Sequence, residues 1–164
     1  MNTIADAAWT AGIIDGEGSI FVMKQGRHDR EREYNYILRV SVQSTDRIMT
    51  SELKRLWPDG AEFMVVIDNR PNNSDTMKWQ VNGKRAARFL QEILPFLRVK
   101  KEQAETAIEF QSTTKKHWKH MTPQDYEKQA ELCAKLKQQK TDLKIGKNSC
   151  ESQNPSDAPL LIGD

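Results

Sequence analysis

The sequence predicts an α+β fold in which one helix and two antiparallel strands form a unit that occurs twice. Two observations support this class. Apolar residues at helical spacing give way to β-type alternation twice along the chain, in the order α-β-β-α-β-β-α. Charged or turn-forming clusters separate the strands within each unit, which is typical of hairpins. Helical segments after the second unit predict additional C-terminal helices.

The first unit begins with a helix over residues 5–14. Thr3 followed by Asp6 forms the acidic version of a capping box, and glycines end the apolar run. The next segment, SIFVMKQ, is rich in β-forming residues, and GRHDRERE separates it from YNYILRVSVQ. In the latter strand Leu38 and Val40 alternate with polar side chains, so we expect one buried face and one polar face.

The second unit follows the same order. TDRIMTSELKRLW carries apolar residues at helical spacing, and WPDG ends this helix. AEFMVVID and TMKWQVN then flank the turn cluster NRPNNSD as a second hairpin. Large aromatic side chains are favoured in the interior, and we assign four of them to the core: Trp57, Trp79, Phe89 and Phe96.

The C-terminal part of the chain is mostly helical in pattern. The helical spacing starts at Gly83, breaks at Pro95 and resumes through KKEQAETAIEFQ. Pro123 then occupies the first turn of a final helix, which we expect to end near Lys140. A basic tract, TTKKHWKH, links these helices either as a solvated connector or as a contact for phosphates.

Composition and length limit the domain organisation and the function classes. We expect one domain over residues 1–142 and a disordered tail over residues 143–164, where the sequence becomes polar. The chain has 164 residues, 29% of them charged, and a mean hydropathy of −0.74, so it has no apolar run that could cross a membrane. The N-terminus lacks the features of a signal peptide. A soluble intracellular protein of the cytoplasm, the nucleoid or an organelle matrix is therefore expected.

Two further features are not diagnostic by themselves. The net charge of +2 is too small to identify a nucleic-acid partner. Cys133 and Cys150 fit neither a disulfide framework nor the paired spacing of a zinc site, and we assign them no role. The function must therefore be sought in the placement of particular charged groups.

The segment WTAGIIDGEGSIFV contains the most unusual charge pattern in the chain. Asp15 and Glu17 alternate with Gly16 and Gly18 where the first helix meets the first strand. In isolation, such acids most often cap a helix and form a solvated turn. The small-residue helix before them and the strand after them favour a functional role instead.

This segment and a later one resemble the LAGLIDADG homing endonucleases. TAGIIDGEG, from Thr10 to Gly18, matches the nine-residue signature of that family, with substitutions at Thr10, Ile13, Gly16 and Glu17 that roughly keep size or charge. FLQEILPFLRVKKEQAETAIEF resembles the family's later segment, in which a proline and a basic cluster precede a helix. The resemblance covers about residues 5–140, and the chain contains one copy of the signature.

The resemblance implies a saddle-shaped antiparallel sheet and a site-specific double-strand DNA endonuclease that cuts a long pseudo-palindromic site. Family members of this type are homodimers, are commonly encoded in mobile introns or inteins, and use Mg²⁺. We expect Mn²⁺ to substitute for Mg²⁺ and Ca²⁺ to support binding without cleavage. Because one signature supplies half of a site, the helix of residues 5–14 is expected to join two chains.

Physical arguments agree with such a pairing. Small residues in this helix, Ala8, Ala11, Gly12 and Gly16, would let a second backbone approach closely. Two Glu17 carboxylates would then converge, and like charges about 4 Å apart repel by roughly 4 kcal/mol at an intermediate dielectric. Cations between them would relieve this repulsion, and oxygen ligands suit Mg²⁺.

Position by position, the resemblance implies roles for several residues in catalysis. Glu17 corresponds to the direct metal ligand, Gly16 supplies a backbone carbonyl to the metal, and Asp15 is a structural and accessory acid that is also a candidate metal ligand. Lys100 corresponds to a basic residue that stabilises charge on the phosphate or activates water, although a solvated helix face is its ordinary alternative. The region that organises solvent in the family contains Gln43 and Asp46, and Asp46 is equally typical of a plain helix N-cap.

Recognition of DNA is expected from the polar face of the sheet and from loops. Arg, Gln, Lys and Ser side chains read base edges in the major groove, and loop arginines bind phosphates. We expect base contacts from the following residues: Phe21, Met23, Gln25, Arg27, Arg39, Ser41, Gln43, Lys78 and Gln80. Phosphate contacts are expected from Arg30, Arg32 and Arg70. The alternative is a half-exposed sheet whose polar face only meets solvent.

The length of the first strand predicts the size of the target. About ten residues at roughly 3.3 Å each span ~33 Å, close to ten base pairs per subunit and about twenty per dimer.

Two other function classes stay open. One is a non-cleaving nucleic-acid binder on the same fold, such as an intron-RNA maturase or a transcription regulator. The other is an unrelated small α/β hydrolytic or binding domain.

Overall fold

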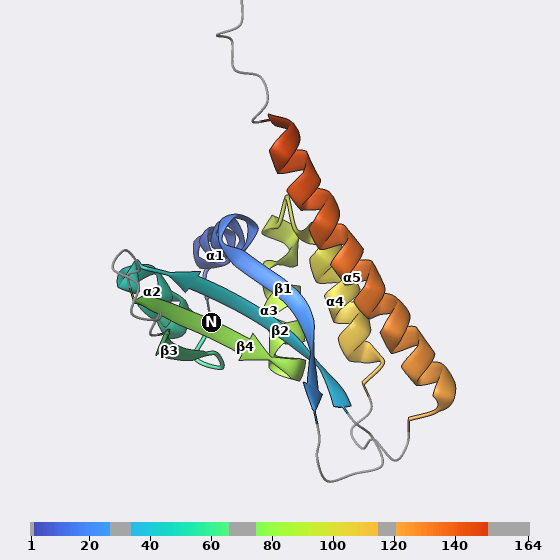
Figure 1. Cartoon of the computed structure of the whole chain (residues 1–164). Coiled ribbons are helices and arrows are strands. Elements are labelled where there is room, and N and C mark those ends of the chain that lie inside the picture. Colours follow the sequence, from blue (N-terminus) through green and yellow to red (C-terminus); the bar gives the residue numbers. More distant parts are fainter. Residues whose placement is uncertain (1, 27–33, 66–74, 115–120, 151–164) are drawn as a thin grey trace, which may run out of the picture.

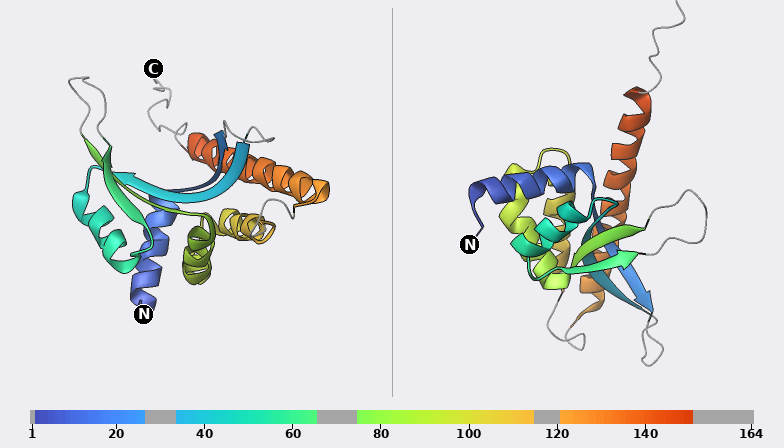
Figure 2. Two further views of the ribbon diagram at one scale, coloured as in Figure 1. Left: turned by 90° about the horizontal axis from the view of Figure 1, so that it is seen from below. Right: turned by 90° about the vertical axis from the view of Figure 1, so that its left-hand side faces the viewer.

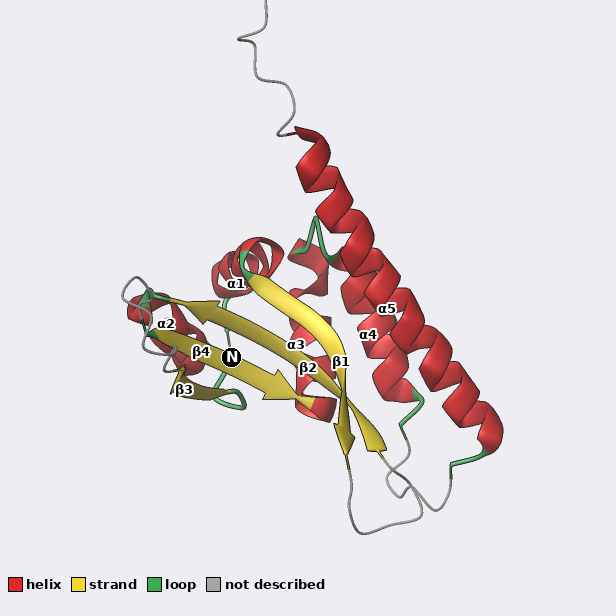
Figure 3. Cartoon of the chain, in the orientation of Figure 1, coloured by secondary structure: helices red, strands yellow, loops and turns green. Residues whose placement is uncertain are grey.

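The computed structural model describes residues 2–26, 34–65, 75–114 and 121–150 (Figure 1). The elements in chain order are α1 (Ile4–Gly16), β1 (Gly18–Gly26), β2 (Tyr34–Ser44), α2 (Arg47–Leu56), β3 (Ala61–Val65), β4 (Thr76–Asn82), α3 (Gly83–Ile93), a 3₁₀ turn η1 (Leu94–Phe96), α4 (Lys101–Ser112) and α5 (Pro123–Cys150). This order confirms the predicted αββαββα arrangement with additional C-terminal helices (Figure 3).

The first helix begins at the predicted capping box. The backbone N–H of Thr3 donates to the Asp6 carboxylate, and the backbone N–H of Asp6 donates to the Thr3 hydroxyl, with N–O distances of 2.8 and 3.2 Å. The Thr10 hydroxyl, which stands where the family signature has leucine, is buried and accepts a hydrogen bond of 3.0 Å from Nε1 of Trp57. This substitution therefore adds a buried polar link between α1 and the end of α2.

The four strands form one antiparallel sheet in the order β1-β2-β4-β3, so the β2·β4 pair joins the two hairpins. Opposite pairs such as Ile20↔Val40 and Val42↔Trp79 place their side chains on one face. Helices α1 to α4 cover this face, and the sheet curves away from them to leave a concave face on the other side (Figure 2). The predicted alternation of a buried and a polar face is confirmed.

Aromatic packing holds the covered face together. The Trp57 and Phe89 rings meet edge to face with centroids 4.9 Å apart, and the Trp79 and Phe89 centroids are 5.1 Å apart. These three side chains are buried, as predicted, while Phe96 is half-buried and packs against the core. Gly60 lies against the Trp79 indole so closely that a Cβ there would be 2.4 Å from Nε1. The loop before β3 therefore packs tightly against the Trp79 ring, with no room for a side chain at residue 60.

The last helix, α5, lies outside the layer that α1 to α4 form on the covered face of the sheet. It packs against α4 and along β1, and it continues to Cys150, beyond the predicted end at Lys140 (Figure 1). Burial raises the pKa of the Cys133 thiol to about 11, so this side chain is neutral near pH 7 and packs as an apolar group. Residues 143–150 of the expected tail are thus helical, and the rest of it lies outside the described residues. No helix in the described part of the chain is long and apolar enough to span a membrane.

Gly18, at the junction of α1 and β1, generates the first testable prediction. Alanine at this position is expected to lower the free energy of unfolding by about 1–3 kcal/mol, because its Cβ would lie 2.7 Å from backbone atoms of Ile14. The control is Gly16→Ala, where a Cβ meets no heavy atom within 4 Å and alanine should add up to ~1 kcal/mol of helix stability. Urea unfolding at equal protein concentration measures both, and equal stability of the two variants would contradict this packing.

Candidate active site and nucleic-acid interface

The Asp15 carboxylate lies at the end of α1 and binds the backbone that leads into α4. The N–H groups of Arg98 and Val99 donate to Oδ2 with distances of 2.8 and 3.2 Å, and the N–H of Lys100 donates to Oδ1 at 2.9 Å. Lys100 is the N-cap of α4 and residues 98 and 99 precede it, so the carboxylate binds the segment that enters the helix, where the helix dipole favours negative charge. Asp15 therefore uses both carboxylate oxygens to fix the start of α4.

Lys100 makes the reciprocal contact. Its Nζ donates to the carbonyl oxygens of Ile14 and Asp15, each at 2.7 Å. These carbonyls belong to the last turn of α1, where the helix dipole favours a cation. The predicted catalytic lysine thus lies beside the acidic turn, and it holds the end of α1 by two charge-assisted hydrogen bonds.

Glu17 differs from Asp15 in its surroundings. It is the C-cap residue of α1, its backbone N–H donates to the Ile13 carbonyl at 2.8 Å, and its side chain is exposed. No hydrogen bond or ion pair to its carboxylate is present among the residues that the structure describes. Gly16 beside it is also exposed. The turn therefore presents one unengaged carboxylate next to an accessible stretch of backbone.

The acidic turn offers oxygen donors of the kind that bind a metal ion, but no preformed cluster of ligands is present in the described residues. Within residues 2–26, 34–65, 75–114 and 121–150, no group of three or more His, Cys, Asp or Glu side chains could hold an ion. The Glu17 carboxylate and a backbone carbonyl are hard oxygen donors of the kind that Mg²⁺ binds. The donor type therefore fits the expected ion, and in the described residues the turn offers this carboxylate and backbone carbonyls as donors.

The two residues predicted to organise solvent lie at opposite ends of one bend in the chain. Gln43, near the end of β2, is exposed, and its Nε2 donates to the Thr76 hydroxyl at 2.8 Å. Oδ1 of Asp46 instead accepts from the backbone N–H groups of Ile48 and Met49 at 2.8 and 3.3 Å. Asp46 is thus the N-cap of α2, which is the alternative that the sequence left open. Its role in catalysis stays a prediction.

Those residues expected to contact bases that the structure describes lie on one face of the sheet. Pairs across the strands, such as Phe21↔Arg39 and Ser41↔Gln80, share the concave face. The same register and alternation place the other described members of the set on it: Met23, Gln25, Gln43 and Lys78. Arg27, Arg30, Arg32 and Arg70 lie outside the described residues.

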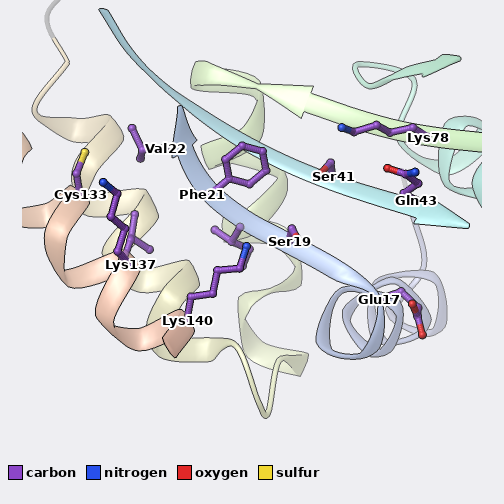
Figure 4. Close-up of a pocket in the computed structure, with 12 residues that line it drawn as sticks. Glu17, Ser19, Phe21, Val22, Ser41, Gln43, Lys78, Cys133, Lys137 and Lys140 are labelled. Carbon is purple, nitrogen blue, oxygen red and sulfur yellow. The ribbon is translucent and has the colours of Figure 1, made fainter. Parts of the chain in front are cut away.

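This face contains a hollow of about 460 Å³ (Figure 4). Glu17 lies at one end of it, Gln43 and Lys78 line the sheet side, and Ser41 forms part of the floor. At the outer end of the face, Nε of Arg39 donates to Oδ1 of Asn82 at 2.8 Å, which holds the guanidinium on the sheet. The acid and the polar side chains predicted to read DNA therefore open onto one space.

Sequence reasoning missed two lysines that line the same hollow. Lys137 and Lys140 on α5 are exposed, and Nζ of Lys140 lies 5.9 Å from the centroid of the Phe21 ring (Figure 4). They belong to a helix of mixed charge, so their residue types gave no signal. Only the packing of α5 beside β1 brings them to the concave face. Phe21, predicted to contact a base, is consequently half-buried beneath a cation.

The different use of the two aspartates gives the second prediction. Asp15→Asn is expected to lower the free energy of unfolding by about 1–3 kcal/mol, because asparagine has one acceptor oxygen where Asp15 uses two. Asp46→Asn is the control and should change stability by less than about 0.5 kcal/mol, since Asp46 caps through Oδ1 alone and asparagine caps equally well. Chemical unfolding checks both. Equal effects of the two changes would argue against the Asp15 contacts.

Comparison with known proteins adds evidence on the fold. No family model and no curated protein sequence matches the chain. The homing endonuclease I-CvuI, solved in complex with its target in the presence of calcium, superposes with a TM-score of 0.69 at 20% identity over 84% of this chain and 85% of that one. The archaeal intron-encoded homing endonuclease I-Vdi141I, complexed with DNA, gives 0.67 at 19% identity over 82% and 84%.

A third similar structure is longer. The meganuclease I-SmaMI, bound to uncleaveable DNA, superposes with a TM-score of 0.58 at 18% identity, over 81% of this chain but only 45% of that one. This chain thus corresponds to about half of I-SmaMI and to most of I-CvuI. The chain has the fold of the LAGLIDADG homing endonucleases, as the resemblance of its sequence implies.

Proposed function

We propose that the chain is a LAGLIDADG endonuclease that cuts double-stranded DNA at a specific site, acts as a homodimer and requires Mg²⁺. The observation that carries this proposal is the opening of Glu17 onto the same hollow as Gln43 and Lys78. An unengaged carboxylate at one end of a polar, concave sheet is suited to hydrolysis of a phosphodiester that the sheet has positioned. I-CvuI and I-Vdi141I, which share the fold, were solved with DNA, and this supports a DNA partner.

The outer face of α1 supports pairing of two chains. Ala8, Gly12 and Gly16 are exposed, and a Cβ built on either glycine meets no heavy atom within 4 Å. Trp9 beside them is 39% exposed and adds apolar area to this face. Two α1 helices packed through this face would bring two Glu17 carboxylates together at the molecular axis.

Such a dimer would also bring the candidate metal ligands of two chains together. Each protomer would contribute the Glu17 carboxylate and the Gly16 carbonyl, and phosphate oxygens would supply further donors. Bound there, Mg²⁺ would polarise the scissile phosphate and lower the pKa of an attacking water. Asp15 would act through structure, because its oxygens are occupied by backbone N–H groups. Lys100 would fix the carbonyl groups that precede Gly16.

DNA would lie along the concave face, with the strands following the major groove. Arg39, Ser41, Gln80 and their neighbours would contact base edges, and Lys137 and Lys140 would lie close to the phosphates on the β1 side. The strand length favours a target of about twenty base pairs for two subunits. A cut of this kind would serve the mobility of an intron or intein, and I-Vdi141I is itself described as intron-encoded.

The third prediction separates chemistry from binding. Glu17→Gln keeps the shape of the side chain but removes its charge, so it should abolish cleavage in Mg²⁺ while duplex binding in Ca²⁺ survives. The experiment first selects a target from a randomised duplex library with the parent protein, and then measures plasmid cleavage and gel shifts. Glu62→Gln is the control, because Glu62 faces α2 and accepts a hydrogen bond from Ser51. Cleavage by Glu17→Gln at the parental rate would move the chemistry to other residues.

The same experiment discriminates the leading alternative. A parent protein that binds a selected duplex or an intron RNA but cuts nothing in Mg²⁺ or Mn²⁺ would be a maturase or a regulator on the same fold. Failure to bind any nucleic acid would instead favour an unrelated hydrolytic or binding domain. A variant of Asp15 would not distinguish an endonuclease from a non-cleaving binder, because the carboxylate binds backbone N–H groups in either case.

The fourth prediction concerns assembly. Gly12→Leu should leave the protomer folded, because no heavy atom lies within 4 Å of a Cβ there, but it should block close approach of a second α1. Sedimentation is expected to show a dimer for the parent and a monomer for the variant, with loss of double-strand cleavage. Ala134→Leu, an exposed small residue on α5, is the matched control. A monomeric parent that cuts both strands would contradict the dimer.

A further inference from the structure

Phe63 in β3 is an exposed aromatic side chain on the polar face of the sheet. The neighbouring Glu62 points towards the helices, since its Oε1 accepts a hydrogen bond of 3.1 Å from the Ser51 hydroxyl of α2. Side chains alternate along a strand, so Phe63 lies on the concave face, where it is opposite Lys78. Its ring is 40% exposed. An apolar ring therefore stands among the polar groups expected to read DNA.

Along the strand direction Phe63 is level with the acidic turn, although β3 lies three strands across the sheet from β1. Phe63 pairs with Lys78, and Lys78 pairs with Gln43. Lys78 and Gln43 line the hollow together with Glu17. Phe63 thus belongs to the cross-strand row at the Glu17 end of the sheet, whereas Gln25 lies at the far end of β1.

Among the described residues, Phe63 is the one large apolar side chain of this face that is exposed. Phe21 on the same face is half-buried, with Lys140 over its ring. Met64, the next residue in β3, is 51% exposed but lies on the opposite face, where it pairs with Met77. The chain therefore offers two adjacent exposed apolar residues, only one of which faces the DNA side.

The chemistry of the major groove determines what such a ring can recognise. Among the base edges there, the C5 methyl group of thymine is the apolar one, and phenylalanine is a suitable contact for it. We propose that Phe63 recognises the methyl group of one thymine in each half-site, at a position nearer to the cut than the base that Gln25 contacts. This inference rests on the proposed function, and it assigns a base preference that none of the polar side chains would give.

The test replaces single thymines by deoxyuridine, which removes only the methyl group. Sites are first selected from a randomised duplex library in Ca²⁺ with the parent, Phe63→Ala, Phe63→Leu and Met64→Ala proteins. The parent and Met64→Ala should require thymine at one inner position, where deoxyuridine should weaken binding about fourfold per substitution. Phe63→Ala should lose both the requirement and the deoxyuridine effect, and Phe63→Leu should retain them in part.

The outcomes separate this inference from the proposed function. If the parent selects no duplex, the proposed function fails. If the parent selects a site and Phe63→Ala selects the same bases with the same response to deoxyuridine, the thymine contact is overturned while the endonuclease proposal stands. A change in sedimentation caused by Phe63→Ala, with base preference unchanged, would assign the ring to a protein interface and would equally overturn the inference.

Discussion

The reciprocal contact between Asp15 and Lys100 determines the geometry of the candidate site. It joins the end of α1 to the start of α4, although the two residues are 85 positions apart in the sequence. An anion caps the N-terminal backbone of α4 and a cation caps the C-terminal carbonyls of α1, so each charge meets the favourable end of a helix dipole. These two residues bind five backbone groups, which are the N–H groups of residues 98–100 and the carbonyls of Ile14 and Asp15. The turn that carries Glu17 is consequently fixed by contacts of the Asp15 carboxylate and of the Lys100 ammonium group.

This constraint gives the two acids of the turn different roles. Both carboxylate oxygens of Asp15 accept hydrogen bonds from backbone N–H groups, while Glu17, two residues later, is exposed at the C-cap of α1. A glycine is required immediately after it, because Gly18 lies against the backbone of Ile14. The chain therefore turns sharply from helix to strand at a point where one carboxylate projects and its neighbour is fixed. Packing therefore distinguishes two acids that look alike in sequence, because Asp15 binds backbone N–H groups and Glu17 is exposed.

The sequence predicts those features of the fold that depend on local periodicity. The capping box of α1 and the faces of β1 and β2 follow from spacings of three residues and of two, and the structure confirms them. The partners of Asp15 could not be predicted, because backbone N–H groups carry no residue-type signal. The position of α5 also escaped prediction, since its polar composition indicates neither its length beyond Lys140 nor its packing beside β1. Lys137 and Lys140 were missed for the same reason.

The placement of α5 also explains why the two edges of the sheet differ. Strand β1, at one edge, packs against α5, which covers part of that edge (Figure 2). The other edge strand, β3, spans only Ala61–Val65, and a short edge is a weak template for such pairing. These described edges are poor templates for pairing, which agrees with the proposal that a second copy would pack on the small-residue face of α1. The proposed dimer would keep both concave faces open, and it would place the two acidic turns, rather than the two sheets, at the axis.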